Sequence, residues 1–545
     1  MEDNEIQIHV VDHGDHSFED TDKKSCCTRL ISEDTKTELC EIYRLAWPTV
    51  FTHLFIATLS TQSIFFCGQI GKLELAAGTL GISFFNVFGF SIAIGLCSAL
   101  DTLCSQAYGA KNFKMVGIVL QRGICILGIA AIFVYAFWIT TEHFLLAIGI
   151  EQEISRMVDK FVMILIPILP ALFGSSLLTR YLSSQGIVRP TLIIGFVSNA
   201  IALGLNFLFV IVMKQGLWGV AISLVIVFYC NLFLTMAYII FSKVYKKTWM
   251  GWSCECLYKW KEFIWLALPG MLMICLEWWS FEAGAFLMGK FGESTLASHG
   301  VLIQLVTLTF MVPYGMSTAA AVRIGHNLGA NKPSLAKLVM KLSIGLTLLC
   351  VSLIILVIVT TRKYIAMAFS NSGEVIEILI RTIPIMAVLS FFDATQGVCS
   401  GIVRGCGQQR IGVIINLISY DFIGLPLAVV LAFVVDMRLS GMWWGLTGGL
   451  LVQTSLYIIL LSCTNWTKQA YLAKKRTDTS HGMKTKDKDK LIKPNGDVDE
   501  DKRNGQTPAQ IWFSRASSLH DLDRITMTTS SADISHNRTF HTHSK

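Results

Sequence analysis

Two glutamates stand in an otherwise uncharged stretch that is long enough to cross a membrane. Glu277 and Glu282 lie within 263–289, FIWLALPGMLMICLEWWSFEAGAFLMG. A carboxylate in hydrocarbon is costly and marks a functional site by default. Desolvation in general raises the pKa of a carboxyl group, which brings its proton exchange toward neutral pH. An ionised carboxylate there attracts a cation and a protonated one releases it, so the stretch predicts coupled exchange of protons and cations. The alternative is a structural acid bonded between helices.

The two glutamates are five positions apart. On a helix this separates them by about 140°, so they do not share one face. We expect one carboxylate to face a cavity, and the other to face a neighbouring helix or a central cleft. Glu277 is the stronger candidate for the exchange group, with Glu282 as a second site or a structural acid.

Further polar and aromatic residues lie in other apolar runs. Asp393, in FFDATQG, and Asp421, in ISYDFIG, are acids of the same kind, with the same structural alternative. The indole faces of Trp278 and Trp279 suit stacking on flat organic cations, each contact contributing roughly 0.5–2 kcal/mol, or packing against lipid or a helix. Uncharged side chains that would line a substrate cavity, or instead bond helices together, are Gln304, Asn86, Asn199 and Asn206.

The composition places these residues in a membrane protein. Of 545 residues, 53% are hydrophobic and 15% are charged, whereas soluble domains carry roughly 25% charged residues. The net charge of +7 lies in short loops and a tail, so it does not indicate nucleic acid. Most cysteines stand singly in apolar runs, and no metal site is predicted. Twelve runs are long enough to span, with cores near 45–66, 76–100, 116–139, 160–180, 191–213, 219–241, 263–289, 297–320, 337–361, 377–402, 411–435 and 441–463.

The loops between these runs predict the topology. With the N-terminus inside, the cytosolic loops hold more Lys and Arg than the opposite loops, and both termini are cytosolic. Asp101, together with Arg323, is expected to lock the cytosolic ends, and the basic linker suits a helix on the inner membrane surface. The predicted parts are a cytosolic N-terminal tail (1–43), an N-lobe of spans one to six (44–241), a cytosolic linker (242–262), a C-lobe of spans seven to twelve (263–463) and a disordered cytosolic tail (464–545).

The two predicted lobes are copies of one unit. SQAYGAKN resembles GHNLGANK, with Gly109 and Gly329 offset by 220, and LAWP ending at Pro48 resembles LALP ending at Pro269, offset by 221. Further matches keep the same order and nearly the same offset. Because each copy has an even number of spans, we expect an all-α fold of two six-helix lobes related by a pseudo-two-fold axis along the membrane normal. The first-lobe positions equivalent to Glu277 and Glu282 are Ile56 and Thr61.

Together these features resemble the multidrug and toxin extrusion (MATE) family, and the E-W-W stretch is most similar to its animal branch. The resemblance implies two six-helix bundles and export of organic cations in exchange for protons. It covers about 44–463 and is carried by FCGQIGKLELAAGTLG, LDTLCSQAYGAKN, CLEWWSFEAG, VPYGMSTAAAVRIGHNLGA and GIVRGCGQQRIG.

The chain departs from this pattern at three positions. Similar animal members usually have glutamate where Gln304 and Asp393 stand, and an uncharged residue where Asp421 stands. One acid is therefore removed, one is shortened and one is added. The acidic set belongs to this chain, so substrate preference does not carry over from the resemblance.

The sequence favours a secondary-active antiporter in the plasma membrane that works as a monomer. Its partners would be small organic cations, protons and the bilayer. It would need no cofactor, because the proton gradient would supply the energy. No G-x-x-x-x-G-K-[ST] motif is present, which argues against an intrinsic ATPase. The alternatives are Na⁺ coupling, or export of organic anions or lipids. Arg and Lys cluster at the cytosolic ends, which argues against a deep anion site. A membrane enzyme would need a reactive constellation that the sequence does not show, and a receptor has no evident use for the repeat.

Overall fold

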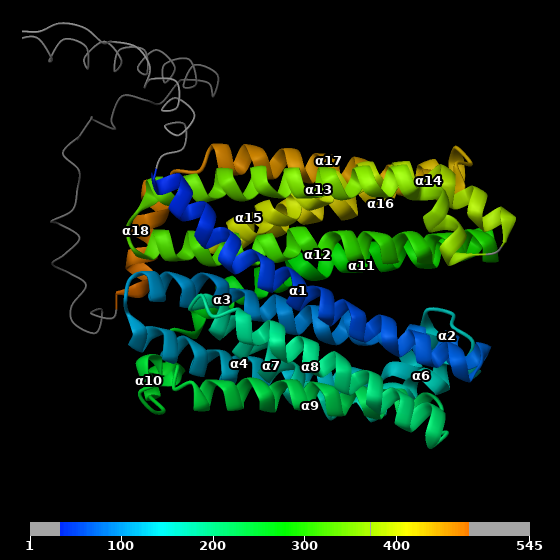
Figure 1. The fold of residues 1–545 in the computed structure, drawn as a ribbon, viewed down its shortest axis with the longest axis horizontal. Coiled ribbons are helices and arrows are strands. Elements are labelled where there is room, and N and C mark those ends of the chain that lie inside the picture. Colours follow the sequence, from blue (N-terminus) through cyan, green and yellow to red (C-terminus); the bar gives the residue numbers. More distant parts are fainter. Residues whose placement is uncertain (1–32, 371, 479–545) are drawn as a thin grey trace, which may run out of the picture. The chain divides into compact units, whose positions relative to one another are not determined.

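The computed structural model describes residues 33–370 and 372–478, all within one compact unit (Met1–Thr479). The described elements are helical throughout. Most of the predicted tails at 1–43 and 464–545 lies outside the described residues. The helices run side by side along the longest axis, as expected where backbone polar groups must be satisfied within each segment (Figure 1).

The N-lobe forms the lower half of the bundle in Figure 1, with α1 running up toward the other half. A break between α6 and α7, beside Pro167, bends this span by 58°. The N-lobe elements are α1 (Glu33–Ile70), α2 (Lys72–Phe85), η1 (Asn86–Phe90), α3 (Ser91–Gly109), α4 (Phe113–Trp138), α5 (Thr141–Ala147), α6 (Gln152–Leu165), α7 (Ile168–Ser184), α8 (Arg189–Asn206), η2 (Phe207–Val212) and α9 (Leu217–Phe241).

The C-lobe forms the upper half of the same view. A short α10 (Tyr245–Thr248) and η3 (Cys254–Leu257) connect the lobes. The C-lobe elements are α11 (Trp260–Met288), η4 (Gly289–Phe291), α12 (Glu293–Gly329), α13 (Pro333–Phe369), α14 (Gly373–Cys406), α15 (Gln409–Asn416), η5 (Leu417–Gly424), α16 (Leu425–Val429), η6 (Val430–Val434) and α17 (Arg438–Ser462), followed by α18 (Trp466–Thr477).

These elements account for the predicted spans. Within the described ranges, 11 helices or continuous helix runs are long and apolar enough to cross a membrane, and the bent pair α6–α7 makes 12. Large apolar side chains point outward from the outer helices, among them Phe133 and Phe241, as expected for surfaces that face lipid. The predicted all-helical fold with six spans in each lobe is therefore confirmed.

Two predicted boundaries and the predicted linker helix differ from the structure. Residues 466–477, assigned to a disordered tail, form α18, and α1 begins at Glu33 rather than near residue 44. The linker is mostly irregular, because its helical part is the single turn α10 and the 3₁₀ turn η3. Helix α18 is held by tertiary contacts: Arg476 donates to the Cys406 carbonyl oxygen (3.2 Å), and Asn112 Nδ2 donates to the Thr477 carbonyl oxygen (2.8 Å).

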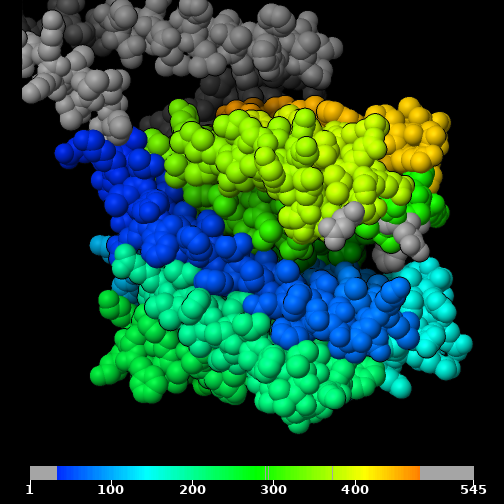
Figure 2. Space-filling view, turned by 45° about the vertical axis from the view of Figure 1, so that its right-hand side comes forward, coloured from blue at the N-terminus to red at the C-terminus, as the bar shows by residue number. Residues whose placement is uncertain are grey.

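The repeated glycines lie at a close contact between the lobes. A Cβ atom on Gly109 would lie 2.2 Å from the carbonyl oxygen of His326, and one on Gly329 would lie 2.0 Å from that of Gln106. Only glycine allows the backbones of α3 and α12 to approach this closely. The repeated motif therefore forms a reciprocal contact between the lobes, at the end of the bundle that carries α18. Figure 2 shows the N-lobe helices, with α1 in blue, meeting the C-lobe, which runs from green to orange, along one seam.

Candidate functional site

A cavity of about 290 Å³, here called the central cavity, lies between the two lobes. Its N-lobe wall comes from α1, α2, η1 and α3, and its C-lobe wall from α11, α12 and α14. Glu277, Glu282 and Asp393 all line it, and no Lys or Arg of the described part of the chain does. The structure therefore brings three of the four predicted acids together on the C-lobe wall.

Glu277 and Asp393 are joined by a glutamine that the sequence reasoning did not single out. Gln396 Nε2 donates to Glu277 Oε1 at 3.1 Å and to Asp393 Oδ1 at 3.0 Å. Gln396 is fully buried, and its Oε1 has no hydrogen-bond partner among the described residues. Its place one helical turn after Asp393, in FFDATQG, was the available signal. We refer to these three residues as the carboxylate cluster.

Two aromatic hydroxyls lie close to the carboxylate cluster. Tyr420 and Tyr457 are fully buried, and both are near enough to interact electrostatically with Glu277. Tyr457 Oη donates to Asn416 Oδ1 at 2.7 Å, whereas Tyr420 Oη has no partner among the described residues. Arg404 also interacts electrostatically with Glu277. The cluster thus has two buried hydroxyl groups and one guanidinium nearby.

Glu282 faces the central cavity as well, beside the Ser83 side chain. The 140° separation predicts different surroundings for the two glutamates, but in the structure both line the same cavity. The reason is that the cavity extends around α11, which packs against helices of both lobes. Glu277 joins the carboxylate cluster, and Glu282 lies one turn and a half further along the same helix.

The two tryptophans separate in the structure. Trp278 lines the central cavity, with its ring 6.0 Å from that of Phe90. Trp279 is not in the cavity wall, because its Nε1 donates to the Val87 carbonyl oxygen (3.2 Å) and its ring packs 5.7 Å from Phe88. Trp278 is therefore available to a ligand, and Trp279 connects the lobes.

The predicted amide residues also take different places. Gln304 lines the central cavity and donates to Thr61 Oγ1 at 3.0 Å, across the seam between the lobes. Asn86 lines it at the start of η1. Asn199 lies outside the cavity wall, because its Nδ2 donates to the Phe55 carbonyl oxygen (2.9 Å) and its Oδ1 accepts from Thr58 (2.7 Å). Asn206 is buried in α8 and also lies outside the wall.

Asp421 does not join the other acids. It lies in η5 and is absent from the central cavity wall. Its Oδ2 is buried without a hydrogen-bond partner among the described residues. The π-helical winding of η5 changes which residues face inward, and periodicity in the sequence does not show such an insertion. The structure thus separates Asp421 from the carboxylate cluster.

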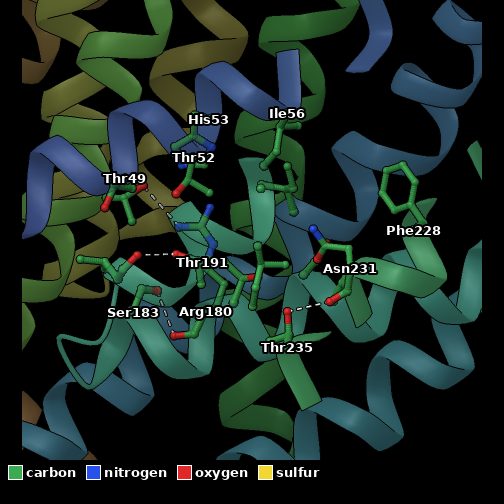
Figure 3. Close-up of a pocket in the computed structure, with 18 of the residues that line it drawn as sticks. Thr49, Thr52, His53, Ile56, Arg180, Ser183, Thr191, Phe228, Asn231 and Thr235 are labelled. Carbon is green, nitrogen blue, oxygen red and sulfur yellow. Dashed lines mark hydrogen bonds between the residues drawn. The ribbon is translucent and has the colours of Figure 1, made fainter. Parts of the chain in front are cut away.

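A second cavity, of about 90 Å³, lies largely within the N-lobe and is here called the N-lobe cavity (Figure 3). It adjoins the central cavity, because four residues line both: His53, Ile56, Phe90 and Ile94. Arg180 is its one Arg, Lys, Asp or Glu residue, and in Figure 3 its guanidinium lies beneath Thr52 and His53. Arg180 lies near the predicted cytosolic end of its span, four residues before the end of α7, but it is buried there and not in a loop.

Arg180 belongs to a buried group of charges that connects the lobes. Asp101 lies 3.3 Å from Arg180 of the N-lobe and 3.7 Å from Arg404 of the C-lobe. Asp101 was expected to act with Arg323, but Arg323 instead pairs with Glu38, at 2.7 Å. Two buried guanidinium groups thus share one carboxylate. The described residues contain no group of three or more His, Cys, Asp or Glu side chains that could hold a metal ion.

Comparison with known proteins agrees with the duplicated architecture. A family model described as MatE matches twice, over residues 48–208 and 269–430. The chain is 36% identical to multidrug and toxin extrusion protein 2 of Mus musculus over 446 residues, which cover 82% of this chain and 78% of that protein. The chain belongs to the MATE family. The starting points of the two matches, 48 and 269, repeat the offset of 221 found between Pro48 and Pro269.

Other MATE proteins extend this result to the structure. Multidrug and toxin extrusion protein 1 of Danio rerio is 38% identical, over 81% of this chain and 74% of that protein. The crystal structure of the eukaryotic MATE transporter AtDTX14 superimposes with a TM-score of 0.78 at 29% identity, covering 82% of this chain and all of that one. The predicted fold class and family are therefore confirmed. The relatives are transporters and not enzymes, and the chain is a multi-span membrane protein of their kind.

Proposed function

We propose that this MATE protein is a secondary-active antiporter that exports small organic cations in exchange for protons. The observation that carries the proposal is the carboxylate cluster on the wall of a cavity between the lobes. The relatives are multidrug and toxin extrusion proteins, and their names support export of varied small molecules. Trp278 gives the same cavity an aromatic face for a flat cation.

The exchange follows from competition for the carboxylate cluster. With Glu277 and Asp393 ionised, the C-lobe wall is negative and binds a cation, and Gln396 donates to both carboxylates. Protonation removes the charge that holds the cation, which then leaves. Because the cavity is bounded by both lobes, relative movement of the lobes would carry the site from one side of the membrane to the other.

We propose protons as the coupling ion, in line with the resemblance to the animal branch of the family. Gln396 contacts one oxygen of each carboxylate, Glu277 Oε1 and Asp393 Oδ1, so the second oxygen of each can take up a proton. Na⁺ coupling is the alternative, because carboxylate oxygens are also ligands for metal cations. The exchange needs no cofactor beyond the ion gradient. We also propose that the protein acts as a monomer in the plasma membrane with both termini in the cytosol, in line with the distribution of loop charges.

Proteoliposomes loaded with the full chain would test this function. An imposed pH gradient should drive uptake of a radiolabelled organic cation, and a Na⁺ gradient alone should not. Glu277→Gln should abolish the proton-driven component. Asp436→Asn is the matched control, because Asp436 is 74% exposed and lies at the end of the bundle away from α18. Full exchange in Glu277→Gln, or uptake driven by Na⁺ alone, would contradict the proposal.

A further inference from the structure

We propose that the N-lobe cavity is a subsite for an anionic group, and that Arg180 binds it. This inference rests on the proposed function in one respect: the adjoining central cavity takes the cationic part of the ligand. The ligand class is an organic cation that also carries a carboxylate, or a small free anion bound beside the organic cation. Both sources share the chemistry of a compact negative group facing a guanidinium.

Arg180 has hydrogen-bonding capacity left for such a group. A guanidinium has five N–H donors. Arg180 Nη1 donates to Asp101 Oδ1 (3.3 Å) and Thr318 Oγ1 (3.4 Å), and its Nη2 donates to Tyr314 Oη (3.4 Å). These three bonds are long, and they leave two N–H groups without a partner in the described structure. The residue is only 6% exposed, so bulk water does not solvate those groups fully.

The charges around Arg180 are also unbalanced. Asp101 is shared between Arg180 and Arg404, and all three side chains are at most 7% exposed. A buried charge is stable only when it is paired and hydrogen-bonded. Glu277 interacts with Arg404 from the C-lobe side, whereas no Asp or Glu lines the N-lobe cavity on the Arg180 side. An anion in this cavity would therefore meet a guanidinium whose one carboxylate partner among the described residues, Asp101, is shared with Arg404.

The remaining wall offers few other donors, and the space that it encloses is small. Most of its hydroxyls donate to carbonyl groups of their own helices, for example Thr52 to Pro48 and Thr191 to Val188, so the N–H groups are the main donors. Asn231 projects into the cavity from α9 (Figure 3), and its Nδ2 makes only a 3.4 Å bond to Ser198. A water needs roughly 10–15 Å³ of such space, so a cavity of about 90 Å³ accommodates a carboxylate.

The two adjoining cavities thus have opposite character. Three carboxylates line the central cavity, one guanidinium lines the N-lobe cavity, and His53, Ile56, Phe90 and Ile94 form the shared boundary. A ligand that crosses this boundary would place its positive end near Glu277 and its negative end near Arg180. The subsite would accordingly distinguish ligands by their anionic group and leave cation binding to the C-lobe.

A matched pair of ligands tests the subsite on the purified full chain in nanodiscs. N-methylnicotinamide and N-methylnicotinate have the same pyridinium ring, but the first carries a carboxamide and the second a carboxylate. We expect Arg180→Gln to raise the equilibrium Kd of N-methylnicotinate at least tenfold and to change that of N-methylnicotinamide less than threefold. Asn231→Leu, which leaves the Asp101 group intact, should weaken N-methylnicotinate binding about three- to tenfold with the same selectivity.

A control variant and a change of anion distinguish a specific effect of Arg180 from a general effect of losing a buried arginine, and a ligand carboxylate from a free anion. Arg122→Gln removes a buried arginine that lines neither cavity and should leave both Kd values unchanged. Replacing chloride by gluconate tests the free-anion source: cation binding that needs chloride and Arg180 would support a subsite for a free anion. Equal effects on both ligands, together with no chloride dependence, would overturn the proposal. These Kd values are measured without a pH gradient, so they do not depend on proton coupling. A failure of proton coupling would instead appear in the proteoliposome uptake assay.

Discussion

The carboxylate cluster makes Gln396 the residue whose replacement tests the site most sharply. Gln396→Met keeps the length and nearly the volume of the side chain but removes its amide. Glu277 and Asp393 then each lose a hydrogen-bond donor, at 3.1 and 3.0 Å. Gln396 is fully buried, so water does not readily take its place. We expect the ionised, cation-binding form of the cluster to be destabilised.

The size of the effect follows from these contacts. A hydrogen bond to a charged group contributes roughly 1.5–3 kcal/mol, so the two bonds contribute about 3–6 kcal/mol. Replacement also removes Gln396 Oε1, a buried acceptor without a partner in the described structure, which recovers about 1–3 kcal/mol. The mid-range values, about 4.5 and about 2 kcal/mol, leave about 2.5 kcal/mol. At about 1.4 kcal/mol for each factor of ten, cation affinity should fall roughly 30- to 150-fold.

Equilibrium binding of a labelled organic cation and proton-driven uptake in proteoliposomes would measure this change. The matched control is Gln453→Met, because Gln453 is also fully buried but its Nε2 donates to the neutral Asn416 Oδ1 (2.8 Å). The control should stay within about threefold of the unmodified protein. A folded Gln396→Met protein with cation affinity within threefold of the original would refute the role assigned to the amide.

Two further predictions concern residues that the structure separates from one another. Asp421→Asn should leave the KM and pH profile of cation uptake within about twofold, since Asp421 does not line the central cavity; a loss as large as that of Glu277→Gln would contradict this. Trp278→Ala should raise the KM for flat aromatic cations about 2- to 30-fold, the equivalent of roughly 0.5–2 kcal/mol of cation–π contact. Trp279→Ala should instead lower the Tm, because it loses the bond to Val87 between the lobes. A change in Tm alone for Trp278→Ala, together with a change in KM alone for Trp279→Ala, would refute the separate roles of the two tryptophans.

The fold was readable from the sequence because its main determinants are local. Apolar length predicts a span wherever backbone groups must be satisfied within one helix. The constant offset between Pro48 and Pro269 predicted the duplication, which the two family-model matches reproduce. The first helical turns of the tail were missed because α18 is stabilised by tertiary contacts, such as that of Arg476 with Cys406, rather than by an apolar run.

The site was readable only in part, because side-chain roles depend on neighbours from other helices. Acids in apolar runs identified Glu277, Glu282 and Asp393 as candidates, and all three line one cavity. Asn199 was a candidate on the same grounds, because it is polar and lies in an apolar run. In the structure, however, both its Oδ1 and its Nδ2 are hydrogen-bonded to residues of α1. Gln396 was not predicted because a single uncharged amide inside a long helix is a weak signal, and only its place one turn after Asp393 indicated a role.

The duplicated scaffold explains why the chemistry of the two lobes is unequal. Ile56 and Thr61, the equivalents of Glu277 and Glu282, line the same central cavity from the N-lobe side. Glutamates at these two positions would add two carboxylates to the three that already line this space, and mutual repulsion would keep several of them protonated. Replacing one set by an apolar and a hydroxyl residue leaves a single acidic wall that can ionise and bind a cation. The N-lobe wall then carries no acid among its described residues. Arg180 therefore faces the N-lobe cavity, next to the cation site, with no carboxylate between the two cavities.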